Sequence, residues 1–214
     1  MNEQIKEFLR VIKLLHDNGC MKHLIIIGTW AEYVYQASGL LSNFTFDQRT
    51  DDCDFLCKNL RLPNPKINLV EILEREGYVI DPDIIHEACK IFSPAGLELE
   101  FLLGKKGAGN EITLKSNFGF YVITLRNVDI LKRNAVKVNL MGMDIEVPKP
   151  EAYVIQKMII HLSRGEKTGR DLRSIKGLWS QLDKTEFWEI CNSLSVKQQK
   201  IVKKFIETHD LENN

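Results

Sequence analysis

Apolar residues in the N-terminal part of the chain switch from helical to extended spacing and back. Residues 3–17 repeat apolar side chains at helical spacing, which predicts a helix that ends at Gly19. Residues 23–27 form a short and almost wholly apolar run, which predicts a strand buried on both faces. A second helix, over about residues 28–37, is expected to follow this strand directly.

The middle of the chain is predicted to consist mainly of strands. One helix, capped by Asn64 and ended by Gly77, is expected to interrupt them, because the residues between return to helical spacing. A hairpin is expected around the turn Ser93–Gly96, which contains Ser, Pro and Gly. The expected strands are 52–57, 78–80, 88–92, 97–103, 118–124, 136–140 and 143–147.

The pattern changes beyond Pro148, where helical spacing continues to the C-terminus. We therefore expect two domains, a mixed α/β domain over residues 1–147 and a helical domain over residues 148–214. The second should contain about four helices, with breaks near Gly165, Asp183 and Leu194.

Composition narrows the class of protein. The chain has 214 residues, of which 44% are hydrophobic, enough for a sizeable core without cross-links. Its 29 basic and 29 acidic residues cancel, which argues against a protein drawn to nucleic acid or membrane by its overall charge. No apolar run approaches the roughly 18 residues of a membrane span, and no signal-peptide pattern opens the chain, so a cytoplasmic protein is expected. Five scattered cysteines indicate reduced thiols rather than disulfides.

Two aspartates open the strand expected at residues 52–57. In an extended segment, Asp52 and Asp54 project to one face while Cys53 and Phe55 point into the core. Two carboxylates about 7 Å apart along a strand suit Mg²⁺ ions, which can hold the attacking and the leaving oxygens in phosphoryl transfer. The alternative is a strand end with solvated aspartates.

A second acidic pair lies in the strand expected at residues 97–103. Strict alternation places Glu98 and Glu100 on one face, opposite Leu97 and Leu99. A third carboxylate can therefore lie beside the aspartate pair, unless both glutamates merely line a solvated face.

Gly28 and Thr29 stand where the buried strand turns into the following helix. Backbone N–H groups at a helix N-terminus favour bound phosphate, and a glycine there permits close approach. Glycine is also common at any strand-to-helix turn, so this feature gains weight only in combination with the acidic strands.

Basic residues gather on the first two C-terminal helices. Helical spacing puts them on one face of each helix, and the two faces would meet across a short turn. The alternative is an ordinary solvated helix surface. The basic residues are Lys157, His161 and Arg164 on the first helix and Lys167 and Arg170 on the second, where Asp171 and Ser174 share the same face.

The motifs, taken together and in this order, resemble the nucleotidyltransferase superfamily named after DNA polymerase β. Its core pattern is an apolar strand ending in Gly-Gly or Gly-Ser, a helix, an Asp-hydrophobic-Asp motif and a third acidic residue on a later strand. The chain is most similar to bacterial stand-alone families of that superfamily. The matching stretches are Gly28-Thr29-Trp30-Ala31, Thr50-Asp51-Asp52-Cys53-Asp54-Phe55, Glu100, Pro150 through Tyr153 to Lys157, Arg164, and Lys167 through Arg170-Asp171 to Leu172.

The resemblance implies a mixed-sheet α/β (α+β) core, a C-terminal helical domain and an enzyme that moves a nucleoside monophosphate from a nucleoside triphosphate to an acceptor hydroxyl, releasing pyrophosphate. It implies that Asp52, Asp54 and Glu100 bind two Mg²⁺ ions, which Mn²⁺ could replace, and that Asp171 orients a neighbouring base. Trp30 is bulky and stands where a nucleotide phosphate would be threaded. The implied nucleotide-binding residues are Gly28, Thr29, Thr50, Lys157, Arg164, Lys167 and Arg170.

The acceptor and two rival functions stay open at this point. The acceptor could be an antibiotic or another small molecule, a tRNA end or a protein side chain. One rival is a nucleotide-binding module without turnover, which a Glu100 turned away from the aspartates would favour. The other is a toxin-antitoxin component that acts by binding a cognate partner protein.

Overall fold

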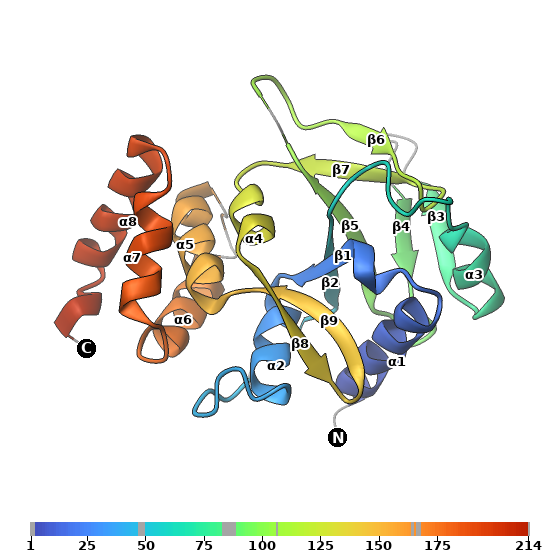
Figure 1. Cartoon of the computed structure of the whole chain (residues 1–214), viewed down its shortest axis with the longest axis horizontal. Coiled ribbons are helices and arrows are strands. Elements are labelled where there is room, and N and C mark those ends of the chain that lie inside the picture. The colour runs from blue at the N-terminus through green and yellow to red at the C-terminus, as the bar shows by residue number, and fades with distance from the viewer. Residues whose placement is uncertain are drawn as a thin grey trace.

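The computed structural model describes residues 3–46, 50–82, 89–105, 107–163, 165 and 168–213. Its two halves lie side by side (Figure 1): a half built on a sheet, which carries the N-terminus, and a helical half, which carries the C-terminus. The helices are α1 (Glu3–Asp17), α2 (Thr29–Ala37), α3 (Leu69–Arg75), α4 (Asp129–Arg133), α5 (Pro150–Ile160), α6 (Thr168–Trp179), α7 (Lys184–Asn192) and α8 (Val196–Thr208), with short 3₁₀ helices at Met21–His23, His161–Ser163 and Leu211–Asn213. The strands are β1 (Leu24–Ile27), β2 (Asp52–Cys57), β3 (Val79–Pro82), β4 (Cys89–Phe92), β5 (Glu98–Gly104), β6 (Thr113–Lys115), β7 (Tyr121–Leu125), β8 (Ala135–Leu140) and β9 (Met143–Pro148).

The main sheet is mixed, as expected. Its strands follow the order β1-β2-β5-β4-β3, while β7 pairs with β5 and β6 pairs with β7. The pairs β2–β5 and β5–β7 are parallel, whereas β1 is antiparallel to β2. β8 and β9 form a separate hairpin around Met141 and Gly142, which both have positive φ. The predicted α/β fold class with a mixed sheet is therefore confirmed.

The core explains why the N-terminal elements form where the pattern predicted them. All four residues of β1 are buried, as a continuous apolar run requires of a strand covered on both faces. α1 turns an apolar face toward this core, with Phe8, Val11, Ile12 and Leu15 buried. The alternating residues Cys53 and Phe55 of β2 are also fully buried.

Three local predictions need correction. α3 is capped by Asn68, whose side chain accepts a hydrogen bond from the Glu71 backbone N–H, and not by Asn64. Asn64 lies between two prolines, which keep the chain out of helical conformation until Asn68. The strand expected from residue 118 begins at Tyr121, and neither β6 nor α4 was predicted.

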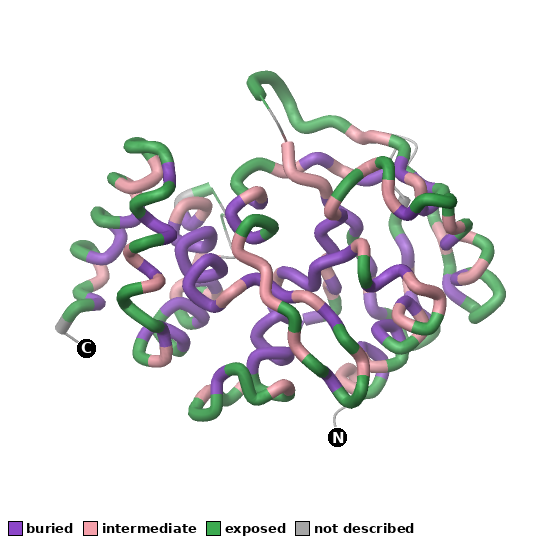
Figure 2. The backbone as a smooth tube through the Cα atoms, viewed as in Figure 1, coloured by how far each residue is buried: buried purple, intermediate pink, exposed green. Residues whose placement is uncertain are grey.

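Beyond Pro148, the described residues of the helical half form four α-helices, in agreement with the sequence pattern. α5 lies in its centre and packs against α6, α7 and α8, and it is buried along almost its whole length in Figure 2. The solvated-surface interpretation of the polar faces is wrong at four residues, because Lys157, His161, Asp171 and Ser174 are all buried. In the described ranges, none of the helices has both the length and the apolar character needed to cross a membrane.

Candidate active site

Asp54 lies directly against the turn that starts α2. In the antiparallel pair of β1 and β2, Asp54 is the register partner of Ile27, the last residue before Gly28. A Cβ atom added to Gly28 would stand only 2.1 Å from Oδ2 of Asp54, and Gly28 has a φ of +66°. Both the close approach and the backbone conformation therefore require glycine at this position.

The acidic residues of β2 and β5 are register partners in the parallel pair. Asp52 is paired with Glu98, and Asp54 with Glu100. Because side chains alternate along both strands, all four carboxylates project from the same face of the sheet. Glu100 is exposed and lies beside Asp54, the aspartate nearest to Gly28. Glu98 lies one pair further away, where its carboxylate is 4.0 Å from the ammonium of Lys90.

Thr29 and Trp30 begin α2 on the other side of this turn. Trp30 is 2% exposed and stacks on Phe8 of α1, with ring centroids 4.2 Å apart. The indole is therefore part of the core between α1 and α2. This corrects the expectation that its bulk stands in the path of a nucleotide phosphate.

Thr50 supports the start of the acidic strand. Its hydroxyl is buried and accepts a hydrogen bond from the Asp52 backbone N–H at 3.3 Å. The neighbouring Asp51 is exposed and accepts a hydrogen bond from Gln4 at 2.6 Å. Thr50 thus contributes to the position of Asp52, while Asp51 belongs to the molecular surface.

Lys157 is buried and paired. Its ammonium donates to Oδ1 of Asp171 at 2.7 Å, and the two side chains are 7% and 1% exposed. It also lies 5.0 Å from the ring centroid of Tyr153, within cation–π range. The carboxylate of Asp171 is therefore paired with a basic side chain of the neighbouring helix.

A second buried carboxylate lies next to this pair. Glu32, on α2, accepts hydrogen bonds from the hydroxyls of Tyr153 on α5 and Ser174 on α6. Burial raises the pKa of Glu32 above its ordinary value, although Lys157 and the two hydroxyl donors oppose this rise. The polar network therefore joins the helix that follows Gly28 to both helices of the C-terminal half.

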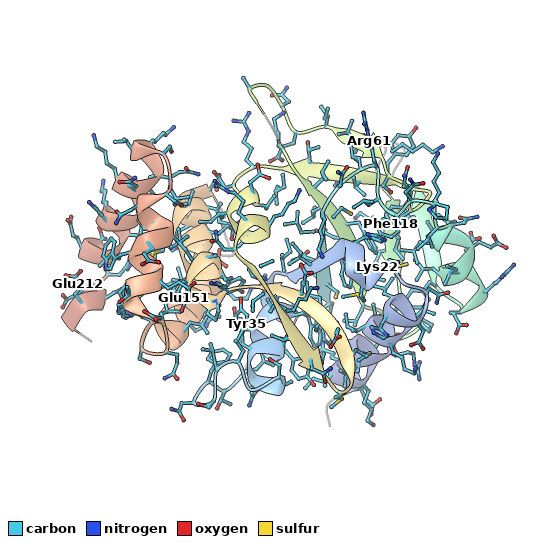
Figure 3. The ribbon with its side chains drawn as sticks, in the orientation of Figure 1. Lys22, Tyr35, Arg61, Phe118, Glu151 and Glu212 are labelled. Carbon is cyan, nitrogen blue, oxygen red and sulfur yellow. The ribbon has the colours of Figure 1, made fainter. Side chains whose placement is uncertain are left out.

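Figure 3 labels Tyr35, which lies at the same junction between the halves. Its hydroxyl donates to the backbone carbonyl of Pro148, immediately before α5, at 2.8 Å. Glu32, Tyr35 and Ser174 were not predicted from the sequence as contacts between the halves. The signal for Glu32 was its place within an otherwise apolar stretch of α2, where a carboxylate needs buried partners.

The remaining basic residues of the expected site are less defined. Arg170 is half-buried in the first turn of α6, and Arg164 and Lys167 lie outside the described residues. His161 is 5% exposed and packs against the rings of Phe205 and His209. Of the polar face predicted from helical spacing, Lys157, His161, Asp171 and Ser174 are thus buried, whereas Arg170 is half-buried.

The cysteines agree with the expectation of reduced thiols. Cys20, Cys53, Cys57 and Cys191 are all free and buried. Burial raises the pKa of the Cys57 thiol to about 12, so it is neither a ready nucleophile nor a ready metal ligand at neutral pH.

The carboxylate oxygens of Asp52, Asp54 and Glu100 are hard donors of the kind that Mg²⁺ and Mn²⁺ prefer. Within the described part of the chain, no three His, Cys, Asp or Glu side chains are arranged as a metal cluster. The residue types and their shared face fit a divalent cation.

Three solved structures are similar to the chain. A nucleotidyltransferase-like protein from Paracoccidioides brasiliensis is 17% identical, with a TM-score of 0.57 over 97% of this chain and 91% of that one. The lincosamide antibiotic adenylyltransferase LnuA is 18% identical over 85% of this chain and 99% of its own, with a TM-score of 0.49. ANT(2")-Ia, solved with adenylyl-2"-tobramycin, is 12% identical over 94% and 99%, with a TM-score of 0.46.

Among curated protein sequences, none matches the chain significantly. A sequence model of a family described as nucleotidyltransferase matches residues 6–189, which is most of the chain and includes both acidic strands, the Gly28 turn and the buried network. The protein therefore belongs to this nucleotidyltransferase family and is a nucleotidyltransferase enzyme.

Proposed function

We propose that this enzyme moves a nucleoside monophosphate from a nucleoside triphosphate to an acceptor hydroxyl, with divalent metal ions held by Asp52, Asp54 and Glu100. One observation carries the proposal: Asp54 lies against the Gly28 turn and, at the same time, beside Glu100. Carboxylates for a cation and backbone N–H groups for phosphate therefore meet in one place.

Each part of this site has a distinct task in the proposal. When bound, Mg²⁺ or Mn²⁺ would neutralise triphosphate charge and favour an ionised acceptor hydroxyl. Backbone N–H groups at Gly28 and Thr29, in the first turn of α2, would donate to triphosphate oxygens. Thr50 would keep Asp52 in place through its hydrogen bond to the strand. Most of the acceleration would come from positioning and charge stabilisation.

We propose that positive charge on the helical side completes the nucleotide site. Arg170 is half-buried at the start of α6, and Arg164 and Lys167 precede it in the sequence. Lys157 is different, because its ammonium is buried against Asp171, and contact with a triphosphate would need this pair to separate. Its contribution is therefore to hold α5 and α6 in place beside α2.

The acceptor is proposed only as a class. LnuA is a lincosamide antibiotic adenylyltransferase, and ANT(2")-Ia was solved with adenylyl-2"-tobramycin. Their structural similarity to this chain is too low to transfer a substrate. A hydroxyl on a small molecule, a tRNA end or a protein side chain all fit the same chemistry.

Isosteric substitutions of the acidic residues test the site. Asp52→Asn, Asp54→Asn and Glu100→Gln should each abolish Mg²⁺-dependent nucleotide binding or pyrophosphate release, because each removes a charged ligand while keeping the side-chain shape. The matched controls are Asp51→Asn, one residue from the site and exposed, and Glu98→Gln, in the next register pair.

Both controls should retain metal-dependent binding and turnover, and urea unfolding should show all five variants to be folded. Wild-type activity in Asp54→Asn would refute the metal assignment. Loss in Glu98→Gln with retention in Glu100→Gln would identify Glu98 as the third carboxylate instead.

A further inference from the structure

A cavity of 350 Å³ lies at the carboxyl ends of the parallel strands β2, β5 and β7, where the chain also passes into α4. Its floor contains Leu103 and Thr124, which are register partners between β5 and β7. Leu103 alternates with Glu98 and Glu100 and therefore projects from the opposite face of the sheet. Lys58, another lining residue, follows Asp54 by four positions, which is about 13 Å along an extended chain. The cavity is thus separate from the candidate active site.

The polar side of this cavity is cationic. Among the described residues, the charged side chains that line it are three lysines, Lys58, Lys105 and Lys132, and the carboxylate of Asp129. Lys58 forms an ion pair with Glu146 at 2.7 Å, so its charge is balanced within the fold. Lys105 and Lys132 instead donate to backbone carbonyls, those of Asn110 and Lys58.

Those two contacts hold Lys105 and Lys132 at the cavity without neutralising their charge. A carbonyl takes one of the three donors of an ammonium, so each lysine can also donate to a ligand. Lysine tips fixed in this way lose little further side-chain entropy when an anion binds. The lining residues therefore favour an anionic group.

The remaining wall is apolar and partly open to solvent. Leu60, Leu103 and Leu114 are half-buried, and Ile112 is 52% exposed, an unusual position for a large apolar side chain. A volume of 350 Å³ lies near the lower end of ligand-sized pockets, which run from about 300 to 1,000 Å³. An inorganic anion would leave this wall in water, whereas an organic anion with an apolar body would cover it.

We propose that this cavity is a binding site for a small amphipathic carboxylate, with the carboxylate at Lys105 and Lys132 and the apolar body against Leu103 and Ile112. The site goes beyond nucleotidyl transfer, since its lining residue Lys58 lies about 13 Å along the chain from Asp54 of the proposed nucleotide site. Its ligand is recognised by one negative charge joined to a short aliphatic or aromatic body.

Octanoate is a suitable probe, with octanamide as its neutral analogue and inorganic phosphate as an anion without an apolar body. Titrations of the full chain, followed by amide chemical shifts in NMR spectra, should show saturable octanoate binding that perturbs Leu103, Ile112 and Leu114. Octanamide and phosphate should each bind at least about tenfold more weakly, because each lacks one of the two recognised features.

Variants locate the charge that is recognised. The double variant Lys105→Gln/Lys132→Gln should weaken octanoate binding by about tenfold or more, since it removes both charge-assisted contacts. A matched double variant of exposed lysines elsewhere, Lys137→Gln/Lys176→Gln, should bind octanoate like the wild type. Affinity for Mg-ATP should be unchanged in both, which separates this proposal from the proposed function.

Three results would overturn the proposal: equal binding of octanoate and octanamide, equal binding of octanoate and phosphate, or an unchanged affinity in Lys105→Gln/Lys132→Gln. The first two are measured on the wild-type protein, so they decide the matter even if the double variant does not fold. Shift changes confined to residues away from the cavity would overturn it as well.

Discussion

At the scale of single residues, the Asp54 carboxylate fills the space that a side chain at position 28 would need. A Cβ at Gly28 would overlap Oδ2 of Asp54, and the backbone there is left-handed. Gly39 is a natural comparison, because its φ is +74° and a Cβ there would meet nothing within 4 Å. Substituting each glycine in turn therefore distinguishes the effect of backbone strain from the effect of displacing the Asp54 carboxylate.

We predict that Gly28→Ala and Gly39→Ala each destabilise the protein by about 1–3 kcal/mol because both glycines have positive φ, and that the overlap with Asp54 adds to the loss in Gly28→Ala. Only Gly28→Ala should also abolish nucleotide transfer, because it displaces the Asp54 carboxylate. Urea unfolding and pyrophosphate release measure the two effects separately. Full activity in Gly28→Ala would show that the contact with Asp54 is not needed.

Alternation along β2 and β5 could be read from the sequence, and the register partners of Asp52 and Asp54 agree with it. The surroundings of Lys157 could not be read in the same way. A lysine at helical spacing with His161 looks solvated until the tertiary fold brings Asp171 to it. Which face a helix buries depends on neighbours that are distant in sequence.

At the scale of elements, the Lys157–Asp171 ion pair links α5 to α6 in the interior. Removing one partner of a buried pair leaves an uncompensated charge, so Lys157→Met should cost about 3–5 kcal/mol of stability. Lys13→Met breaks the exposed pair with Asp17 and should cost no more than about 1 kcal/mol. Urea denaturation of both variants makes the comparison, and equal losses would contradict the buried assignment.

Glu32, which joins α2 to α5 and α6, gives a prediction about pH. Burial raises its pKa above 4.5 and the charge of Asp171 adds to the rise, whereas Lys157, Ser174 and Tyr153 oppose it. The folded state therefore holds the proton more tightly than the unfolded chain, and the resulting stability is complete below pH 4.5 and lost as the pH rises through the raised pKa. Glu32→Gln does not titrate, so its stability should fall less than that of the wild type between pH 4.5 and about pH 8. Identical pH profiles in urea unfolding would show that Glu32 does not titrate in this range.

Elements with strong periodicity, such as α1, β1 and β2, were predicted almost to the residue. α4 has five residues and β6 has three, which is too short for a hydrophobic period to stand out. The cap of α3 was misplaced because Asn64 and Asn68 offer the same side chain, and only the observed hydrogen bond to Glu71 distinguishes them.

At the scale of the whole molecule, the two halves meet through the residues of the later sequence motif. Tyr153 on α5 and Ser174 on α6 donate to Glu32 on α2, and Tyr35 on α2 donates to the carbonyl of Pro148. The order of the motifs in the sequence was sufficient to suggest the fold class. The pairing of β2 with β5 across the intervening α3, β3 and β4 brings the acidic residues together, and sequence spacing alone could not establish that pairing.

The central claim is that the α-phosphorus of a nucleoside triphosphate, with its nucleoside, is what the enzyme transfers. The most direct measurement incubates the protein and a hydroxyl-rich cell extract with Mg²⁺ and ATP or CTP, labelled either at the α- or at the γ-phosphorus. We predict that α-label becomes attached to an acceptor, γ-label leaves as pyrophosphate, and Asp54→Asn transfers neither while Asp51→Asn behaves like the wild type. Transfer of the γ-label to the acceptor, or equal α-transfer by Asp54→Asn, would contradict the account.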